Sequence, residues 1–357
     1  MWRVDRRGEA LAAIIDDALA RGLGSAVAVS VGDGGREVVR LAHGFTRRVP
    51  DRGEPIDDTT PFDIASLTKP IATAAIAMVA VGDRKLDLEA PIRSYLPDAA
   101  STGSVRDLLG HAAGYVAHVE LYRALRANPP ADPRAELVAR AMREPCQPPG
   151  VAAVYSDLGY ITLGAVLERA TGVPLELAFA QLVAEPLGLA AKFAGTSTIA
   201  GSVATELDDR GLVCGRVHDE NAYYGGGVCG HAGLFASIAD VAAFAEAIVA
   251  TANGEARGRL APYVVEQFFT DAPVANGSWR LGWDTPAPAP GNSQAGDRWP
   301  REGAVGHLGF TGTSLWLDLP RRRWCALLAN RVHPTRGDGS ADAMRALRRA
   351  VNDAALD

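Results

Sequence analysis

The alternation of apolar and polar positions predicts strands near both ends of the chain. Residues 26–31 and 37–42 flank a Gly-Asp-Gly-Gly turn, which is typical of a β-hairpin. Residues 312–319 and 324–329 are two further predicted strands, joined by Pro320-Arg321-Arg322. Helical periodicity predicts a first helix at about 9–20 and a last helix at about 341–350.

The middle of the chain is mainly helical. Short helical stretches occur at 105–109, 135–143, 161–171 and 175–184, and another, at about 238–250, follows the glycine-rich loop 225–227. Residues 68–81 are almost wholly apolar, which is typical of a helix that is buried on all sides. We therefore expect a discontinuous α/β sheet domain, residues 1–66 and 225–357, with a mainly helical domain, 67–224, inserted into it. The active site would lie in the cleft between the two.

Composition narrows the class of protein. The chain has 357 residues, 36 basic and 42 acidic, with a net charge of −6, so it has no electrostatic footprint for nucleic acid. The longest apolar run, 71–81, is too short to span a bilayer, and the first residues lack the uninterrupted apolar region expected of a secretory signal. We expect a cytoplasmic protein that acts on a small molecule without a cofactor and contacts neither nucleic acid nor membrane. Its oligomeric state is left open.

The four cysteines are too few for a disulfide framework in a chain of this length. Cys214, His218, Cys229 and His231 could be drawn as a zinc site, because their side chains suit the metal. However, the closely spaced ligand pairs of zinc sites are missing. The pattern favours ordinary thiols and no bound metal.

Ser66 and Lys69 form an S-x-x-K motif at the start of the apolar helix. A spacing of three places the hydroxyl and the amine on one helical face, so that the amine can activate the serine. Lys69 is one of only three lysines, with Lys85 and Lys192, among 36 basic residues. Unlike arginine, a buried lysine can have its pKa lowered and act as a base, which we expect here. The alternative is a helix-capping serine beside an incidental lysine.

Further motifs follow in an order that resembles the serine β-lactamase superfamily over nearly the whole chain, most closely its class C and esterase-like branch. These motifs are Ser66-Leu67-Thr68-Lys69, Val105 to His111, Pro149-Gly150, Tyr155 to Tyr160, Thr171-Gly172, Pro186-Leu187-Gly188 and His307 to Gly312. The resemblance implies the fold of β-lactamases and DD-peptidases, an antiparallel sheet flanked by helices in a three-layer sandwich.

The resemblance also implies roles for individual residues. Ser66 would form an acyl-enzyme, and Lys69 and Tyr155, the tyrosine of the family's Y-x-N motif, would share the proton, with Lys69 stabilising the tyrosine phenolate. The backbone N–H groups of Ser66 and Phe310 would form the oxyanion hole. His307-Leu308-Gly309 would take the place of K-T-G on the sheet edge that lines the cleft, and Gly309 would contact the substrate there.

Three departures from the family pattern bear on the substrate. Asp157 replaces an asparagine, His307 replaces a lysine and Leu308 replaces a hydroxyl-bearing residue. Together they remove a permanent cation and a hydroxyl donor and add an acidic group, which weakens attraction for a substrate carboxylate. We therefore expect poor β-lactamase activity.

Other segments resemble a bacterial subgroup of N-acetylmuramoyl-L-alanine amidases and penicillin-binding-protein-4B-like carboxypeptidases. These are 217–224, 230–235 and 330–334. His231, together with Asn221, would contact the substrate, or else His231 would hold its loop against the His218-Asp219 segment. We expect His43, His118 and His333 to have no functional role and His111 to fix a helix end.

The preferred hypothesis is a cytoplasmic serine amidase acting on a muramoyl-peptide or a similar cell-wall fragment. The alternatives are an esterase of small acyl esters, a D,D-carboxypeptidase or weak β-lactamase, and a non-catalytic ligand-binding module on the same fold.

Overall fold

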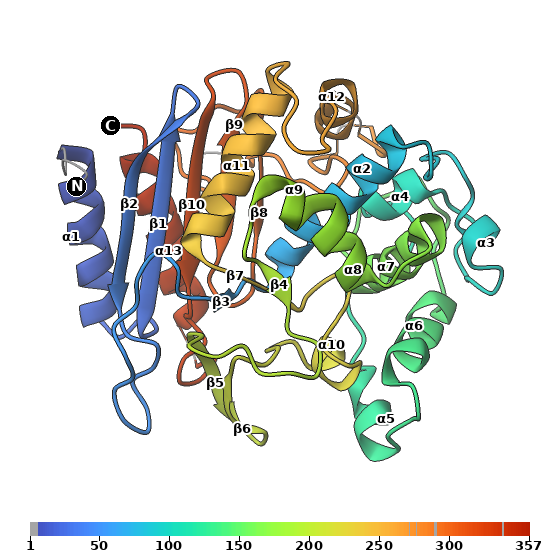
Figure 1. Ribbon diagram of the computed structural model, residues 1–357, viewed down its shortest axis with the longest axis horizontal. Helices are drawn as coiled ribbons and strands as arrows, with labels where there is room; N and C mark the ends of the chain where they lie inside the picture. Colours follow the sequence, from blue (N-terminus) through green and yellow to red (C-terminus); the bar gives the residue numbers. More distant parts are fainter. Residues whose placement is uncertain (1–5, 271, 276, 289–290, 338) are drawn as a thin grey trace.

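The computed structural model describes residues 6–357 except 271, 276, 289–290 and 338. Its centre is a five-stranded antiparallel sheet (Figure 1). The strands lie in the order β2 (Arg36–Gly44), β1 (Ala26–Asp33), β10 (Arg323–Ala329), β9 (Ser314–Asp318) and β8 (Ala304–Leu308). The first and last strands of the chain are thus neighbours, with Val27 opposite Ala329.

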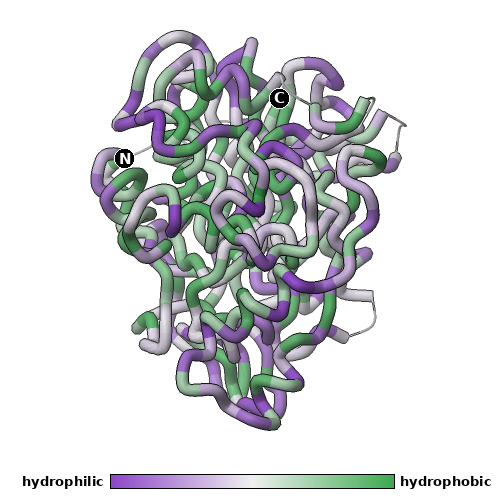
Figure 2. The backbone as a smooth tube through the Cα atoms, turned by 90° about the vertical axis from the view of Figure 1, so that its right-hand side faces the viewer, coloured by the Kyte–Doolittle hydropathy of each residue, from purple (hydrophilic) through white to green (hydrophobic). Residues whose placement is uncertain are grey.

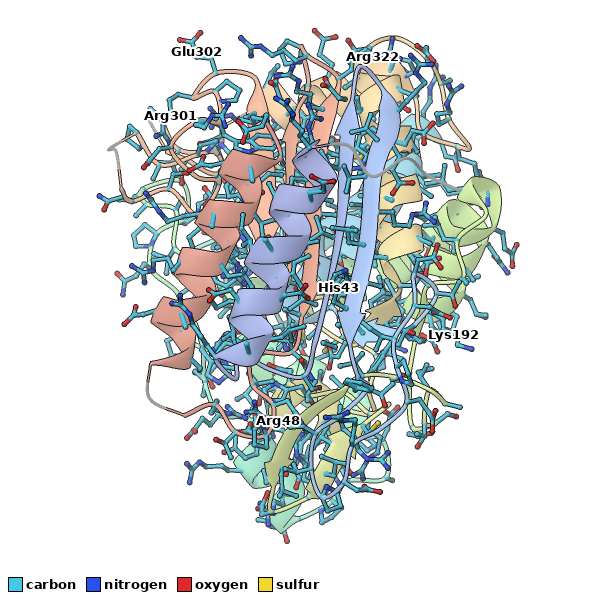
Figure 3. The ribbon with its side chains drawn as sticks, turned by 90° about the vertical axis from the view of Figure 1, so that its left-hand side faces the viewer. His43, Arg48, Lys192, Arg301, Glu302 and Arg322 are labelled. Carbon is cyan, nitrogen blue, oxygen red and sulfur yellow. The ribbon has the colours of Figure 1, made fainter. Side chains whose placement is uncertain are left out.

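Alternation along the strands gives the sheet two buried faces. In β1, Val27, Val29 and Val31 pack in one apolar cluster with α1 (Arg6–Ala20) and α13 (Ser340–Ala354). The intervening Ala26 and Ala28 face the larger cluster, which includes α11 (Ile238–Ala252). Figure 3 shows α1 and α13 side by side over the sheet, and Figure 1 shows α11 on its opposite face. This is the three-layer arrangement that the family resemblance implied.

The remaining helices lie mostly beyond α11, to the right in Figure 1. They are α2 (Ala75–Gly82), α3 (Ile92–Tyr95), α4 (Val105–Leu109), α5 (Tyr122–Ala127), α6 (Pro133–Arg143), α7 (Asp157–Thr171), α8 (Leu175–Phe179), α9 (Glu185–Leu187), α10 (Glu220–Tyr224) and α12 (Pro262–Thr270). A 3-10 turn, η1 (Ala65–Leu67), and two π-helical turns, η2 (Lys69–Ala74) and η3 (Ala180–Ala184), extend these helices. Two small sheets pair β3 (Phe62–Asp63) and β4 (Lys192–Phe193) with β7 (Leu234–Ala236), and β5 (Ala204–Asp208) with β6 (Gly211–Cys214).

The run from Ala65 to Gly82 forms the central helix of the larger core. It is long and apolar enough to cross a membrane by length and composition, although the sequence suggested a shorter apolar stretch. However, 83% of this run is buried inside the protein, as befits the core helix of a globular fold. In Figure 2 many hydrophilic segments follow the outline of the molecule and hydrophobic ones are concentrated within it.

Most of the long predicted elements are present. The first hairpin, the two late strands, the buried helix and the helices at 105–109, 238–250 and 341–350 are confirmed within a few residues. The predicted strand 312–319 begins only at Ser314, because Gly312 lies in a turn with a φ of 122°. Strand β8 and the β5–β6 hairpin were not predicted from periodicity. The division into domains 1–66 with 225–357 and 67–224 stays a prediction.

Candidate active site

The segment that presents Ser66 is held in an uncommon backbone conformation. Ala65, directly before it, has a φ of 48°, a left-handed conformation that is rare for alanine. The buried Asp63 carboxylate accepts the Ala65 N–H at 2.8 Å and the His218 N–H at 2.7 Å, which fixes this turn. Ser66 therefore stands in the first helical turn and lines a cavity, while the helix behind it is buried. Backbone strain of this kind is common at functional sites.

Lys69 is the centre of the polar group around Ser66. Its fully buried Nζ lies 3.0 Å from Ser66 Oγ, 2.6 Å from the Tyr155 hydroxyl and 2.8 Å from Asp157 Oδ1. It also lies 3.4 Å from the His231 carbonyl oxygen. The structure thus brings together the three residues that the resemblance implied to be catalytic, and adds Asp157 to them.

Aromatic rings fix Tyr155. The ring of His111 lies 4.8 Å from the Tyr155 ring between centroids, and its Nδ1 accepts the Ser156 N–H at 3.1 Å. On another side, Trp279 stacks on Tyr155 with centroids 5.3 Å apart. His111 therefore supports the tyrosine rather than only ending a helix, and Trp279 was missed by the sequence reasoning because it lies far away in the chain.

The protonation states of Lys69 and Tyr155 differ from those expected from the sequence. Burial would lower the pKa of Lys69, but the Asp157 carboxylate, and after it Tyr155, raise it above its ordinary value. Burial likewise opposes ionisation of Asp157, yet the Lys69 ammonium holds the pKa of that carboxyl well below its usual range. Burial raises the pKa of Tyr155, and the opposing effect of Lys69 is smaller. The expectation of a lysine with a lowered pKa beside a tyrosine phenolate is thus wrong for the free enzyme, because Asp157 forms an ion pair with the lysine.

The loop that carries Phe310 is bonded directly to the segment before Ser66. The Thr311 hydroxyl donates to the Asp63 carbonyl and the Thr313 hydroxyl to the Ile64 carbonyl, both at 2.9 Å. On the far side of the loop, the Arg348 guanidinium donates to the Gly309 carbonyl at 2.7 Å. The two backbone segments proposed to form the oxyanion hole are therefore held in a fixed relation to each other.

His307, Leu308 and Gly309 line the cavity at the edge strand β8, where the resemblance placed them. His307 Nδ1 donates to the Leu308 carbonyl at 2.8 Å. Burial, with a smaller contribution from Lys69, lowers the pKa of His307 to about 3, so this residue is neutral at physiological pH. Position 307, which carries a lysine in the family, is thus uncharged in this protein.

Two predicted substrate contacts do not line this cavity. The buried Asn221 side chain accepts the Tyr122 N–H and donates to the Val119 carbonyl, both at 2.8 Å, so its amide braces that loop. His231 is buried, and its Nε2 lies 2.9 Å from Asp219 Oδ1. Burial opposes protonation of His231, but Asp219 raises its pKa to about 10. We correct the expectation of direct contact for both residues, since both side chains are buried outside the cavity lining.

The close approach of the 230–233 loop to α7 depends on a glycine. A Cβ at Gly230 would lie 2.1 Å from the Tyr160 carbonyl oxygen, so no larger residue fits there without a shift. This approach brings the His231 carbonyl within reach of Lys69.

His118 was expected to have no role, yet it lines the cavity and its Nδ1 lies 3.3 Å from Asp157 Oδ2. The hypothetical zinc ligands do not converge. His218 lies 3.0 Å from Glu206 and His231 pairs with Asp219, and no metal-binding group of three or more such side chains occurs in the part of the chain that the structure describes. The four cysteines are free thiols.

The cavity in front of Ser66 has a volume of about 570 Å³ and a strongly basic side. Arg331, Arg345 and Arg348 line it and have no carboxylate partner among the described residues. By contrast, three of its carboxylates are paired, Asp157 with Lys69, Asp219 with His231 and Glu220 with Arg336. The arginine cluster (Arg331, Arg345 and Arg348) was missed because these residues come together only when β10 and α13 pack beside the Phe310 loop.

A strained nucleophile turn, a buried lysine bonded to both serine and tyrosine, and a sheet-edge loop beside them define a serine hydrolase of the S-x-x-K type. The β-lactamase family model matches residues 11–349, and the chain belongs to this family.

Relatives in this family carry several activities in their names. The N-acetylmuramyl-L-alanine amidase of Bacillus subtilis (strain 168) is 28% identical over 361 residues, covering 90% of this chain and 80% of that protein. A protein of Escherichia coli (strain K12), provisionally named D-alanyl-D-alanine carboxypeptidase, is 28% identical over 320 residues, covering 78% of this chain and 71% of that protein. Among solved structures, SurE with D-Leu aligns with a TM-score of 0.74 and 26% identity, covering 98% of this chain and 76% of that chain.

Proposed function

We propose that this protein is a cytoplasmic amidase that releases the peptide from a muramoyl-peptide or a similar cell-wall fragment through an acyl-enzyme on Ser66. The observation that carries the proposal is the arrangement of Ser66, Lys69 and Tyr155 within hydrogen-bond distance at the floor of a cavity with a basic side. The name of the Bacillus subtilis relative favours an amide of muramic acid as the substrate.

Each step of the proposed reaction has a group to perform it. Once Lys69 has lost a proton to solvent, Ser66 Oγ attacks the acyl carbon, and the Ser66 proton passes to the Lys69–Tyr155 pair. The backbone N–H groups of Ser66 and Phe310 stabilise the oxyanion. The C–N bond then breaks as the leaving amine takes the proton from Tyr155. Water subsequently attacks the ester, giving the free acid and returning the proton to Ser66.

The arginine cluster supports an anionic substrate. A muramoyl dipeptide carries a free carboxylate beyond the amide that is cleaved, and guanidinium groups that have no carboxylate partner bind carboxylates well. This modifies the argument made from the departures at Asp157, His307 and Leu308. Arginines on other elements replace the cation lost at position 307, so weak β-lactamase activity stays a prediction that rests on Asp157 and Leu308.

The test is product analysis by mass spectrometry after incubation with N-acetylmuramoyl-L-alanyl-D-isoglutamine. We expect the wild-type protein to release free N-acetylmuramic acid and L-alanyl-D-isoglutamine, and the Ser66→Ala variant to release neither. An unchanged substrate would contradict the amidase proposal.

A second candidate function is a D,D-carboxypeptidase, favoured by the provisional name of the Escherichia coli relative and by the same arginine cluster. A peptide ending in D-Ala-D-Ala and a neutral p-nitrophenyl ester, assayed in parallel, separate the possibilities. Release of D-alanine would support the carboxypeptidase, and turnover of the ester alone would support the esterase.

Arg345→Gln is expected to lower kcat/KM for the anionic muramoyl dipeptide by roughly 10-fold, mainly through KM, because it removes one charge-assisted contact. Hydrolysis of the neutral ester should change little. Arg349→Gln is the matched control, because Arg349 lies next to Arg345 on α13 but pairs with Asp297 at 2.6 Å. Equal losses for the anionic and the neutral substrate would contradict a role in recognising charge.

A further inference from the structure

Asp157 lies where its carboxylate can control the protonation state of Lys69. Its Oδ1 lies 2.8 Å from Lys69 Nζ, and Lys69 is fully buried. We propose that Asp157 is a positioning residue that holds Lys69 as an ammonium in the free enzyme, so that the base for Ser66 forms only after a proton leaves this ion pair. This inference rests on the proposed mechanism and adds to it a residue that sets the pH at which the nucleophile becomes active.

The structure stabilises the anionic form of Asp157 from three sides. Asp157 is the first residue of α7, a 15-residue helix whose N-terminus favours a negative charge. Its second carboxylate oxygen, Oδ2, lies 3.3 Å from His118 Nδ1, and its first oxygen binds Lys69. The side chain is only 18% exposed, so water screens these interactions weakly.

The other groups that contact Lys69 carry no negative charge. Ser66 and the Tyr155 phenol are neutral acceptors, and the His231 backbone contributes a carbonyl oxygen at 3.4 Å. The neighbouring rings of His111 and His307 have lowered pKa values, chiefly because of burial, so they are uncharged at neutral pH. Among the described residues, Asp157 is thus the sole carboxylate in contact with Lys69.

The nearest other charges largely cancel each other. The His231 imidazolium and the Asp219 carboxylate form their own pair at 2.9 Å. His118 is half-exposed, and its hydrogen bond to Asp157 raises its pKa. When protonated, His118 shares the negative charge of Asp157 and weakens its hold on Lys69.

Removal of the Asp157 carboxylate lowers the pKa of Lys69, because the carboxylate interacts favourably with the ammonium form of the lysine and not with the free amine. An opposite charge at this distance changes a pKa by about 1–3 units. In Asp157→Asn, which keeps the shape of the side chain, the amine therefore becomes available at lower pH.

The presence of only three lysines permits a direct measurement. In protein labelled with ¹³C at lysine Cε, Lys85→Arg and Lys192→Arg variants assign the three NMR signals. Both of these lysines are exposed, and Lys192 lies at the surface in Figure 3. In the wild type we expect Lys69 to remain an ammonium at the pH, about 10.4, at which the exposed lysines are half titrated. In Asp157→Asn we expect Lys69 to titrate at least about one unit lower than in the wild type.

Two further variants make the test specific. Asp284→Asn removes another cavity carboxylate that does not contact Lys69, and we expect it to leave the Lys69 titration in place. His118→Gln, at a half-exposed position, should change the Lys69 titration by less than Asp157→Asn does, because the imidazole contacts Asp157 and not Lys69. A Lys69 signal that titrates at the same pH in the wild type and in Asp157→Asn, or that responds equally to Asp284→Asn, would overturn the proposal. No substrate is used, so this result is independent of the muramoyl-peptide assay.

Discussion

Replacing Ser66 by alanine is expected to abolish turnover of every substrate that the wild-type protein hydrolyses, with a loss in kcat of about 10⁴-fold or more. Ser66 lines the cavity and its Oγ lies 3.0 Å from Lys69 Nζ, and without this hydroxyl no acyl-enzyme can form. The measurement is kcat, together with the intact mass of the protein during turnover. The wild type should gain the mass of the acyl group and Ser66→Ala should not.

Ser94→Ala is a suitable control, because Ser94 is an exposed residue of α3 whose hydroxyl donates to the Pro91 carbonyl. It should keep the activity of the wild type. Persistent turnover or an acylated Ser66→Ala protein would mean that another nucleophile is used and that the proposed mechanism is wrong.

Replacing Lys69 by arginine is expected to lower kcat by about 10³-fold or more although the positive charge is kept. Arginine can still pair with Asp157, but its guanidinium does not give up a proton at accessible pH, so it cannot relay the proton of Ser66. The pH profile of kcat/KM should lose the rise that deprotonation of Lys69 produces in the wild type.

Lys85→Arg makes the same chemical change at an exposed position and should have no effect on kcat. Because Lys69 is fully buried, thermal unfolding of Lys69→Arg must be measured alongside, so that lost activity in a folded protein is separated from misfolding. A folded Lys69→Arg protein with full activity would show that the amine is not needed to move the proton.

The sequence predicted best those features of the site that short sequence motifs encode. Ser66 and Lys69 share one helical turn, and Tyr155 belongs to a short motif in a recognisable place, so their meeting could be inferred. The 304–308 strand carries a glycine within five residues and shows no clear alternation, so β8 could not be predicted from periodicity.

Contacts between segments that lie far apart in the chain could not be predicted from the sequence. His118 gains a role only because its loop packs against the start of α7, and Arg345 only because the first half of α13 lines the same cavity as the Phe310 loop. The protonation state of Lys69 depends on a distance of 2.8 Å to a residue 88 positions away, which no local pattern contains. Asn221 was misjudged for the same reason, since its partners Tyr122 and Val119 lie about a hundred positions earlier.

The order of strands in the central sheet has a consequence for biosynthesis. β1 lies between β2 and β10, and its pairing of Val27 with Ala329 joins residues separated by most of the chain. During translation the N-terminal hairpin therefore emerges long before its second partner strand and presents an unpaired edge, a surface prone to aggregation. The ribosome must deliver β10 before the sheet closes, so we expect folding to be slow and a nascent chain that stalls before β10 to depend on chaperones.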